Sequence, residues 1–273
     1  MSLVSQCSTC TSIAMYAYHA VFVLQLFFCF TEATGSSIVG GKESEPHSKA
    51  YMVSLQHANG SHECGGVLIR KDFVLTAAHC QFKKMTVILG AHNIRRRSEK
   101  TQRIKVAEFH PHPNYTYPPN YSNDIMLLKL QQNAQLNTYI KVLELPKKKK
   151  KKNLPANTTC TVAGWGQTVS GRKMGLSNVL KEATEKIQFD FECKHIWQDY
   201  FQTGVMICTK HDEKGGFCWG DSGGPLICKK KFEGIVSYAD PSNCSNPRYP
   251  HVFTKVRSFL DWIEKVMQGK TAA

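Results

Sequence analysis

From Ile38 onward the chain is a succession of short β-type runs, and no other feature limits its fold as much. Turn residues such as Gly, Pro and Asn separate the runs. The runs are Tyr51–Gln56, Gly66–Ile69, Phe73–Thr76, Met85–Leu89, Ile125–Leu130, Cys160–Ala163 and Gly234–Ser237. Many short strands joined by turns are typical of sandwiches and barrels. We therefore predict an all-β fold.

One helix is predicted, at the end of this pattern. Apolar side chains recur there at helical spacing, at Val256, Phe259, Leu260, Ile263, Val266 and Met267. Earlier in the chain, residues 141–159 contain two prolines and a lysine run without periodicity, which indicates a connection between two halves. Residues 111–123 are rich in Pro, Asn and Tyr and are typical of a surface loop, which Asp124 follows directly.

The first 37 residues contain no Lys or Arg and only one acid. Their 11-residue apolar run, Ala20–Phe30, is shorter than the roughly 20 residues of a membrane-spanning helix. It suits the hydrophobic region of a secretory signal, and Ala33–Gly35 supplies a small-residue cleavage pattern. Residues 1–35 are predicted to be a signal peptide. A signal anchor is the alternative, and the true start is Met1 or Met15.

Cysteine usage agrees with export. Three of the 11 cysteines lie in the leader, and the other eight form an even set that is typical of a disulfide framework in a secreted protein. Eight cysteines allow many pairings, and the sequence alone does not choose among them. Metal binding is the alternative, but the body has no CxxC pair. Five N-x-S/T sequons are candidate glycan sites, at Asn59, Asn114, Asn120, Asn157 and Asn243.

The body also carries a large positive charge. Its 35 basic and 20 acidic residues leave a net +15, concentrated in Arg95–Arg97, Lys147–Lys152 and Lys229–Lys231. Such runs attract polyanions, although a merely solubilising surface is the alternative. No nucleic-acid fold signature and no interleaved aromatics accompany the runs, so we do not expect a specific nucleic-acid partner. We predict an anionic proteoglycan or heparin bound through Lys147–Lys152.

Four motifs carry a resemblance to a known family. In chain order they are IVGG at Ile38–Gly41, TAAHC at Thr76–Cys80, NDIMLLKL at Asn123–Leu130 and GDSGGPL at Gly220–Leu226. A chain with these motifs in this order resembles the chymotrypsin family of serine proteases. The similarity spans Ile38–Gln268, and the stretch Ile38–Gln56 resembles the granzyme, mast-cell protease and cathepsin G branch.

The resemblance implies a fold of two six-stranded antiparallel β-barrels with a C-terminal α-helix. The serine protease domain would span residues 38–273. The first barrel would occupy about residues 38–145, the linker about 146–159, and the second barrel with the helix about 160–273.

The resemblance also assigns catalytic roles to His79, Asp124 and Ser222. A serine hydroxyl is a weak nucleophile at neutral pH, so a base must take its proton, and the pKa of histidine suits that task. Asp124 would hold the imidazole tautomer while Ser222 attacks the peptide carbonyl. The backbone N–H groups of Gly220 and Ser222 would form the oxyanion hole. This mechanism requires no metal or organic cofactor.

Disulfide pairing and activation are implied in the same way. The family's framework pairs Cys64–Cys80, Cys160–Cys228, Cys193–Cys208 and Cys218–Cys244. In the family, cleavage before the residue matching Ile38 frees an ammonium that binds the acid preceding the nucleophile, here Asp221. Ser37 precedes Ile38 where trypsin-like activation needs Arg or Lys. Residues 36–37 are therefore predicted to be an activation dipeptide that a dipeptidyl peptidase removes.

The predicted substrate pocket involves Gly216, Phe217, Ser237, Tyr238, Ala239 and His251. Trypsin-like members carry an Asp six residues before the nucleophile, where this chain has Gly216, so we do not expect cleavage after Lys or Arg. Phe217 narrows the pocket, Ala239 crowds its rim, and Ser237–Ala239 pairs its backbone with the substrate strand. His251 leaves two alternatives open: it binds an acidic P1 side chain, or it is structural beside a pocket for apolar P1 residues.

The sequence thus predicts a serine endopeptidase that is secreted or stored in secretory granules, with a non-tryptic P1 preference. The alternative is a catalytically weak cationic protein that binds heparin or acts as an antimicrobial. Such proteins usually lack part of the triad, and here all three residues are present. Protein substrates are the predicted partners beside the proteoglycan and the dipeptidyl peptidase. No membrane span is expected in the mature chain.

Overall fold

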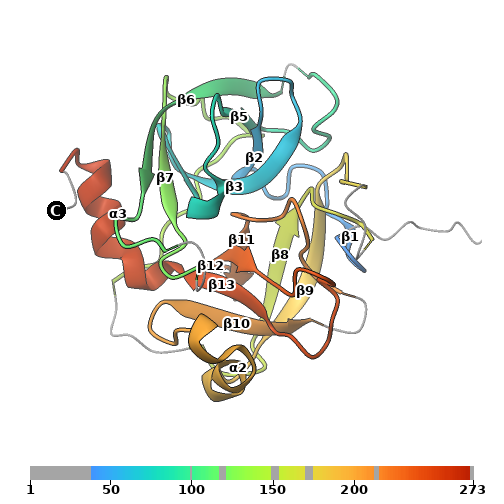
Figure 1. The fold of residues 1–273 in the computed structure, drawn as a ribbon. Coiled ribbons are helices and arrows are strands. Elements are labelled where there is room, and N and C mark those ends of the chain that lie inside the picture. Colours follow the sequence, from blue (N-terminus) through green and yellow to red (C-terminus); the bar gives the residue numbers. More distant parts are fainter. Residues whose placement is uncertain are drawn as a thin grey trace, which may run out of the picture. The chain divides into compact units, whose positions relative to one another are not determined.

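The computed structural model of the protein describes residues 38–98, 100–116, 121–148, 154–169, 175–211 and 215–270. The predicted signal peptide (1–35), the predicted activation dipeptide (36–37), Asn120 and Lys149–Lys152 lie outside the described residues. The described part consists mostly of strands. They form two closed six-stranded antiparallel barrels followed by a C-terminal helix, which confirms the predicted fold class (Figure 1).

The first barrel is built from the first half of the described chain. Around the barrel its strands are β2 (Met52–Gln56), β3 (His62–Arg70), β4 (Phe73–Thr76), β7 (Met126–Leu130), β6 (Gln102–Pro111) and β5 (Thr86–Leu89). The apolar runs predicted five of these strands. The core side chains Val53, Leu55, Val67 and Leu128 are fully buried. Sequence reasoning missed β6, because charged and exposed residues interrupt its apolar positions.

The second barrel is built from the second half. Around the barrel its strands are β8 (Thr159–Gly164), β9 (Lys181–Ile187), β10 (Met206–His211), β13 (His251–Lys255), β12 (Lys231–Tyr238) and β11 (Pro225–Cys228). Pairing of β8 with β9 closes it, and the short β1 (Lys42–Glu43) pairs with the start of β9, which β10 does not reach. Between β9 and β10 lie α2 (Asp190–Trp197) and η2 (Gln198–Tyr200), which were not predicted.

The predicted terminal helix is present, with a 3₁₀ turn as its start. The turn η3 (Val256–Phe259) leads into α3 (Leu260–Met267). Phe259 and Ile263 belong to the same hydrophobic cluster as Leu128 of β7, so the helix packs on the first barrel although it follows the second in sequence (Figure 1). None of the helices among the described residues has the length and apolarity that crossing a bilayer requires.

Four disulfides brace these elements, and they are the four pairs that the resemblance implies. Cys64–Cys80 joins β3 to the turn η1 (Ala78–Cys80), and Cys160–Cys228 joins β8 to β11 at directly opposed positions. Cys193–Cys208 ties α2 to β10. Cys218–Cys244 links the loop before β11 to the loop before β13. The two loops that the last bridge connects both contribute to the site described next.

Candidate active site

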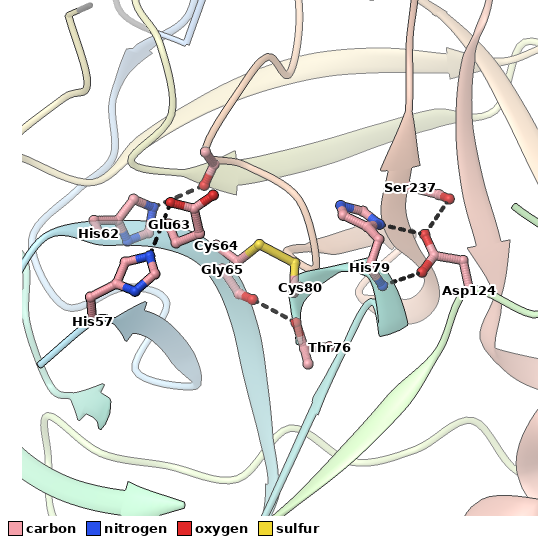
Figure 2. Close-up of a disulfide and its surroundings, with 11 residues drawn as sticks. His57, His62, Glu63, Cys64, Gly65, Thr76, His79, Cys80, Asp124 and Ser237 are labelled. Atoms are coloured by element: carbon pink, nitrogen blue, oxygen red, sulfur yellow. Dashed lines mark hydrogen bonds and ion pairs between the residues drawn. A yellow bond between two sulfur atoms is a disulfide. The ribbon is translucent and has the colours of Figure 1, made fainter. Parts of the chain in front are cut away.

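His79 lies in η1, the turn that follows β4. The turn is anchored on both sides: Cys80 is bonded to Cys64, and the Thr76 hydroxyl donates to the Gly65 carbonyl at 2.8 Å (Figure 2). The side chain of His79 is 19% exposed, which leaves one edge of its ring accessible. Two strands and a disulfide thus fix the position of a histidine that still reaches the surface.

Asp124 lies two residues before the start of β7 and faces His79. Its side chain is fully buried. Its Oδ2 accepts a hydrogen bond from His79 Nδ1 at 2.7 Å and from the Ser237 hydroxyl at 2.6 Å. Its Oδ1 accepts one from the His79 backbone N–H at 3.0 Å (Figure 2). With its proton held on Nδ1 by the carboxylate, the neutral imidazole leaves Nε2 as the free base.

The two groups shift each other's pKa. Burial raises the pKa of Asp124, but the positive charge of His79 and the hydrogen bonds from His79 and Ser237 outweigh burial and hold the pKa below its usual value. Burial likewise lowers the pKa of His79, and the charge and hydrogen bond of Asp124 outweigh it, so the pKa lies above 6.5. The pair therefore favours the charged imidazolium more than an isolated histidine does.

Ser222 and His79 line the same cavity, which has a volume of about 700 Å³. In the described part of the chain no hydrogen bond joins the Ser222 hydroxyl to the His79 ring. Such contacts are often long in sites without bound substrate. The Ser222 carbonyl accepts from Gly65 N–H at 2.7 Å, so a single glycine of β3 fixes both Ser222 and the η1 anchor Thr76.

The turn around Ser222 depends on its glycines. Gly220 has φ +92° and Gly223 has φ +79°, a region that side-chain-bearing residues rarely adopt. A Cβ at Gly223 would also lie 2.1 Å from Thr76 Oγ1. At Gly220 it would lie 2.8 Å from a methyl carbon of Leu176. The backbone around the predicted oxyanion hole therefore requires glycine on both sides of the serine.

Asp221, beside the serine, is a buried carboxylate whose hydrogen bonds among the described residues come from backbone donors. It accepts hydrogen bonds from Gly166 N–H at 2.7 Å and from Cys218 N–H at 3.0 Å. Burial is the main cause that raises its pKa to about 7, and the two backbone hydrogen bonds offset only part of that effect. Ile38 is fully buried, with φ +48°, and its nitrogen is a peptide amide in this uncleaved chain.

The residues predicted to form the substrate pocket divide into two groups. Phe217, Ser237, Tyr238 and Ala239 line the cavity together with the Cys218–Cys244 disulfide. Gly216 and His251 do not line it. His251 is fully buried, its Nε2 donates to the Cys244 carbonyl at 2.7 Å, and its Nδ1 donates to a carboxylate at 2.8 Å. Both ring nitrogens of His251 are thus bonded to protein groups, and the residue does not line the cavity. Of the two alternatives left open for His251, this arrangement favours the structural one, which stays a prediction.

Comparisons with known proteins agree with this architecture. A protein-family model described as trypsin matches residues 38–263. The chain belongs to the trypsin family. It is 42% identical to cathepsin G of Mus musculus, over 91% of this chain and 92% of that protein. It is also 42% identical to granzyme B of Rattus norvegicus, over 91% and 98%. These relatives confirm the predicted branch.

A solved structure gives the same result. Neuropsin, a serine protease expressed in the limbic system of mouse brain, superposes with a TM-score of 0.75 at 35% identity, over 83% of this chain and 98% of that chain. The protein is thus a serine protease, as predicted. The relatives' names give no support to the non-catalytic alternative.

Sequence reasoning missed the partner of His251 in this trypsin-family protease. It is Glu185 of β9, which is fully buried and also accepts a hydrogen bond from the Thr209 hydroxyl. Burial opposes both charges, but the mutual attraction outweighs it, so the pKa of Glu185 lies below and that of His251 above the usual value. A Cβ at Gly216 would lie 2.5 Å from Glu185 Oε1 and 2.6 Å from His251 Cε1, which explains the glycine there.

Aromatic residues on the cavity rim were also missed. Trp219, immediately before Gly220, is 58% exposed, and the ring centroid of Tyr121 lies 6.3 Å from that of His79. Both rings extend the apolar surface of the protease around Ser222. The only available sequence signal was their proximity to the motif residues Gly220 and Asp124.

Among the residues that the structure describes, one group of side chains has metal-ligand geometry. The sulfurs of Cys64 and Cys80 and a ring nitrogen of His79 lie within 4.8 Å of one another. Both sulfurs are bonded in the Cys64–Cys80 disulfide, so they offer no thiolate to a metal ion.

Proposed function

We propose that this protease hydrolyses peptide bonds with Ser222 as nucleophile, His79 as general base and Asp124 as the group that orients the imidazole. The observation that carries the proposal is the hydrogen bond of 2.7 Å between His79 and the buried Asp124, beside a cavity that both His79 and Ser222 line. His79 takes the hydroxyl proton as Ser222 attacks the carbonyl, and the tetrahedral oxyanion is held by the N–H groups of Gly220 and Ser222. His79 then gives the proton to the leaving amine.

The pocket favours an apolar P1 side chain of moderate size. Phe217 and Ala239 contribute apolar surface, and the Cys218–Cys244 disulfide forms a wall. The Ser237 hydroxyl donates its hydrogen bond to Asp124. None of these groups offers a free charge to an acidic or basic P1 residue. The ion pair of His251 with Glu185 argues against the acidic alternative, and Gly216 argues against Lys and Arg.

The direct test is a peptide library varied at P1, cut by protein that begins at Ile38, with Ser222→Ala as the control. We expect cleavage after apolar residues that is lost in Ser222→Ala. Preferential cleavage after Asp or Glu would contradict the proposed pocket, and unchanged cleavage by Ser222→Ala would contradict the proposed triad.

We also propose that the uncleaved chain is a zymogen. Asp221 is a fully buried carboxylate with a pKa raised to about 7, which is the environment expected of a group that lacks its cationic partner. Removal of residues 36–37 by a dipeptidyl peptidase would give Ile38 an ammonium, whose burial against Asp221 would order the oxyanion turn. Mature protein from its natural source that starts at any residue other than Ile38 would contradict this proposal.

Export, glycosylation and polyanion binding complete the proposal. The four sequon residues within the described part of the chain, Asn59, Asn114, Asn157 and Asn243, are all exposed, which is what glycan attachment needs.

Lys148 already pairs with Asp261 and Glu264 of α3, so binding of an anionic proteoglycan would depend on the other lysines of Lys147–Lys152. Replacing those lysines with Gln is expected to lower the salt concentration that elutes the protein from heparin, and an unchanged elution would contradict this role. We infer storage in a secretory granule or release from the cell.

A further inference from the structure

A second cavity, of about 330 Å³, lies beside the oxyanion turn. Two of its lining residues border Gly220: His62 Nε2 donates to the Gly220 carbonyl at 2.9 Å, and Leu176 occupies the space where a Gly220 Cβ would point. This cavity shares no lining residue with the one that contains Ser222. Gly220 therefore borders the second cavity and lies two residues before Ser222, which lines the first.

Three arginines line this second cavity: Arg95, Arg97 and Arg103. All three are exposed, and none of the described residues that line the cavity with them is acidic. In the part of the chain that the structure describes, the arginines in ion pairs are Arg70 and Arg257, which lie elsewhere. Three guanidinium groups without a carboxylate produce a positive potential that is available to a ligand.

Hydrogen bonds position two of these guanidinium groups. Arg95 Nε donates to Asn178 Oδ1 at 3.0 Å, and Arg103 Nη1 donates to Gln56 Oε1 at 3.2 Å. A guanidinium has five N–H donors, so each group keeps donors for a ligand. The planar fork matches the two oxygens of a carboxylate, which makes arginine well suited to recognising one.

Arg103 is also connected to the oxyanion turn through a chain of buried side chains. Gln56 donates to the Ser54 hydroxyl at 3.1 Å, Ser54 bonds His62 Nδ1 at 2.8 Å, and His62 bonds the Gly220 carbonyl. This chain holds the arginine-lined wall at a fixed distance from the predicted oxyanion hole. A site that is rigidly placed next to the scissile bond suits the substrate itself.

We propose that this cavity binds an acidic side chain, Asp or Glu, of the substrate segment that follows the scissile bond. The inference rests on the proposed function, because it places the substrate chain across Gly220. Ile94 and Leu176 provide apolar surface for the methylene groups of the side chain, while the arginines bind its carboxylate. A sulfated glycan is the less suitable ligand, since a cavity of about 330 Å³ beside the oxyanion turn fits one side chain better than an extended chain.

The test compares two quenched peptides that are identical up to the scissile bond and carry Glu-Glu or Gln-Gln at the second and third positions after it. We measure the ratio of their kcat/KM values for protein that begins at Ile38 and for Arg97→Gln, Arg103→Gln and the double variant. Arg96→Gln is the matched control, because it removes the same charge from a neighbouring exposed residue that does not line the cavity. An endoglycosidase is applied to all proteins first, since Asn59 of a sequon lies on the rim.

We expect the wild type to prefer the Glu peptide about tenfold, the double variant about twofold, and Arg96→Gln about tenfold again. High salt should reduce the wild-type preference, because the arginines are exposed. A wild-type ratio near one, or a loss in Arg96→Gln as large as in Arg97→Gln, would overturn the proposal. So would lower affinity of the double variant for a heparin oligosaccharide with an unchanged peptide ratio, since the cavity would then be a polyanion site.

Binding of the same peptides to Ser222→Ala, followed by fluorescence anisotropy, separates this inference from the proposed catalysis. Tighter binding of the Glu peptide that is lost on adding Arg97→Gln supports the cavity even if no peptide is cleaved. Equal binding of both peptides, together with normal cleavage by the wild type, would leave the triad intact and overturn the cavity.

Discussion

The two barrels each bury a carboxylate against a histidine, and the two pairs differ in access. His79 and Asp124 lie at the cavity, where the histidine side chain keeps 19% of its surface exposed. In His251 and Glu185 both side chains are fully buried, and both ring nitrogens of the histidine are bonded. The chemistry of the groups is the same, with a distance of 2.7 Å in one pair and 2.8 Å in the other. The proposed general base differs from the fully buried ion pair in one respect: its second ring nitrogen lies at a cavity and accepts no hydrogen bond from another described group.

The largest expected effect separates the pairs by activity. Asp124→Asn should lower kcat by about 10⁴, because an amide no longer holds the required imidazole tautomer in a triad. Glu185→Gln should lower kcat by less than about tenfold, because its histidine does not reach the substrate. The measurement is steady-state kinetics on one apolar P1 substrate. Similar losses in both variants would mean that the second pair also takes part in catalysis.

The second effect concerns stability, and here the His251–Glu185 pair is expected to matter most. Glu185→Ala should lower the free energy of unfolding by about 3–5 kcal/mol, because it leaves His251 buried without its partner. Replacing the whole pair, with Glu185→Leu and His251→Val together, should recover most of that loss, since a well-packed apolar pair avoids the desolvation of two charges. Urea unfolding measures the stability of both variants. Each variant also carries Ser222→Ala, which prevents self-cleavage. If the double variant is as unstable as Glu185→Ala, the charged pair stabilises the fold relative to apolar side chains, and its attraction exceeds the desolvation that it costs.

The stability that the His251–Glu185 pair contributes should depend on pH. The pKa of His251 is raised, so its contribution is complete below about 6.5 and is lost as pH rises through the folded value. The pKa of Glu185 is lowered, so its contribution is complete above about 4.5 and is lost as pH falls through the folded value. The difference in unfolding free energy between wild type and the apolar double variant should therefore peak between about pH 4.5 and 6.5. A flat difference from pH 3 to 9 would contradict the charged pair.

A third buried carboxylate, Asp221, extends the comparison because none of the described histidines bonds it. Its pKa of about 7 in the uncleaved chain exceeds the ordinary 3.8, so the folded state holds a proton that the unfolded chain releases. Stability of the precursor should fall as pH rises from about 4 to 7, by up to about 4 kcal/mol. Protein that starts at Ile38 should lose less stability over this range, because the new ammonium favours the charged carboxylate. Urea unfolding of both forms on a Ser222→Ala background tests this, and parallel pH profiles would contradict the proposed activation.

The contrast between the pairs also explains what the sequence could predict. His79 and Asp124 stand in short motifs whose residue types are recognisable locally, and the strands around them follow from apolar runs. Glu185 is one acid in the strand KEATEKI, and its burial depends on His251, 66 residues away. No local pattern carries that information. The helix α2 was missed for a similar reason: Cys193 is its only buried residue, and a disulfide to β10 holds it in place.

The smallest expected effect compares two serine hydroxyls that donate to a carboxylate. Ser237 donates to the buried Asp124 at 2.6 Å, and Ser242 donates to the partly exposed Asp240 at 2.7 Å. Ser237→Ala removes one of three hydrogen bonds to Asp124, and a bond to a buried charge is worth about 1 kcal/mol or more. We expect kcat to fall about five- to tenfold with little change in KM. Ser242→Ala, the matched control, should change kcat by less than about twofold, because water replaces the lost donor at a partly exposed site. Equal effects on kcat in the two variants would mean that burial does not strengthen the hydrogen bonds to Asp124. The His79–Asp124 and His251–Glu185 pairs would then differ only in how far the histidine is exposed to the cavity.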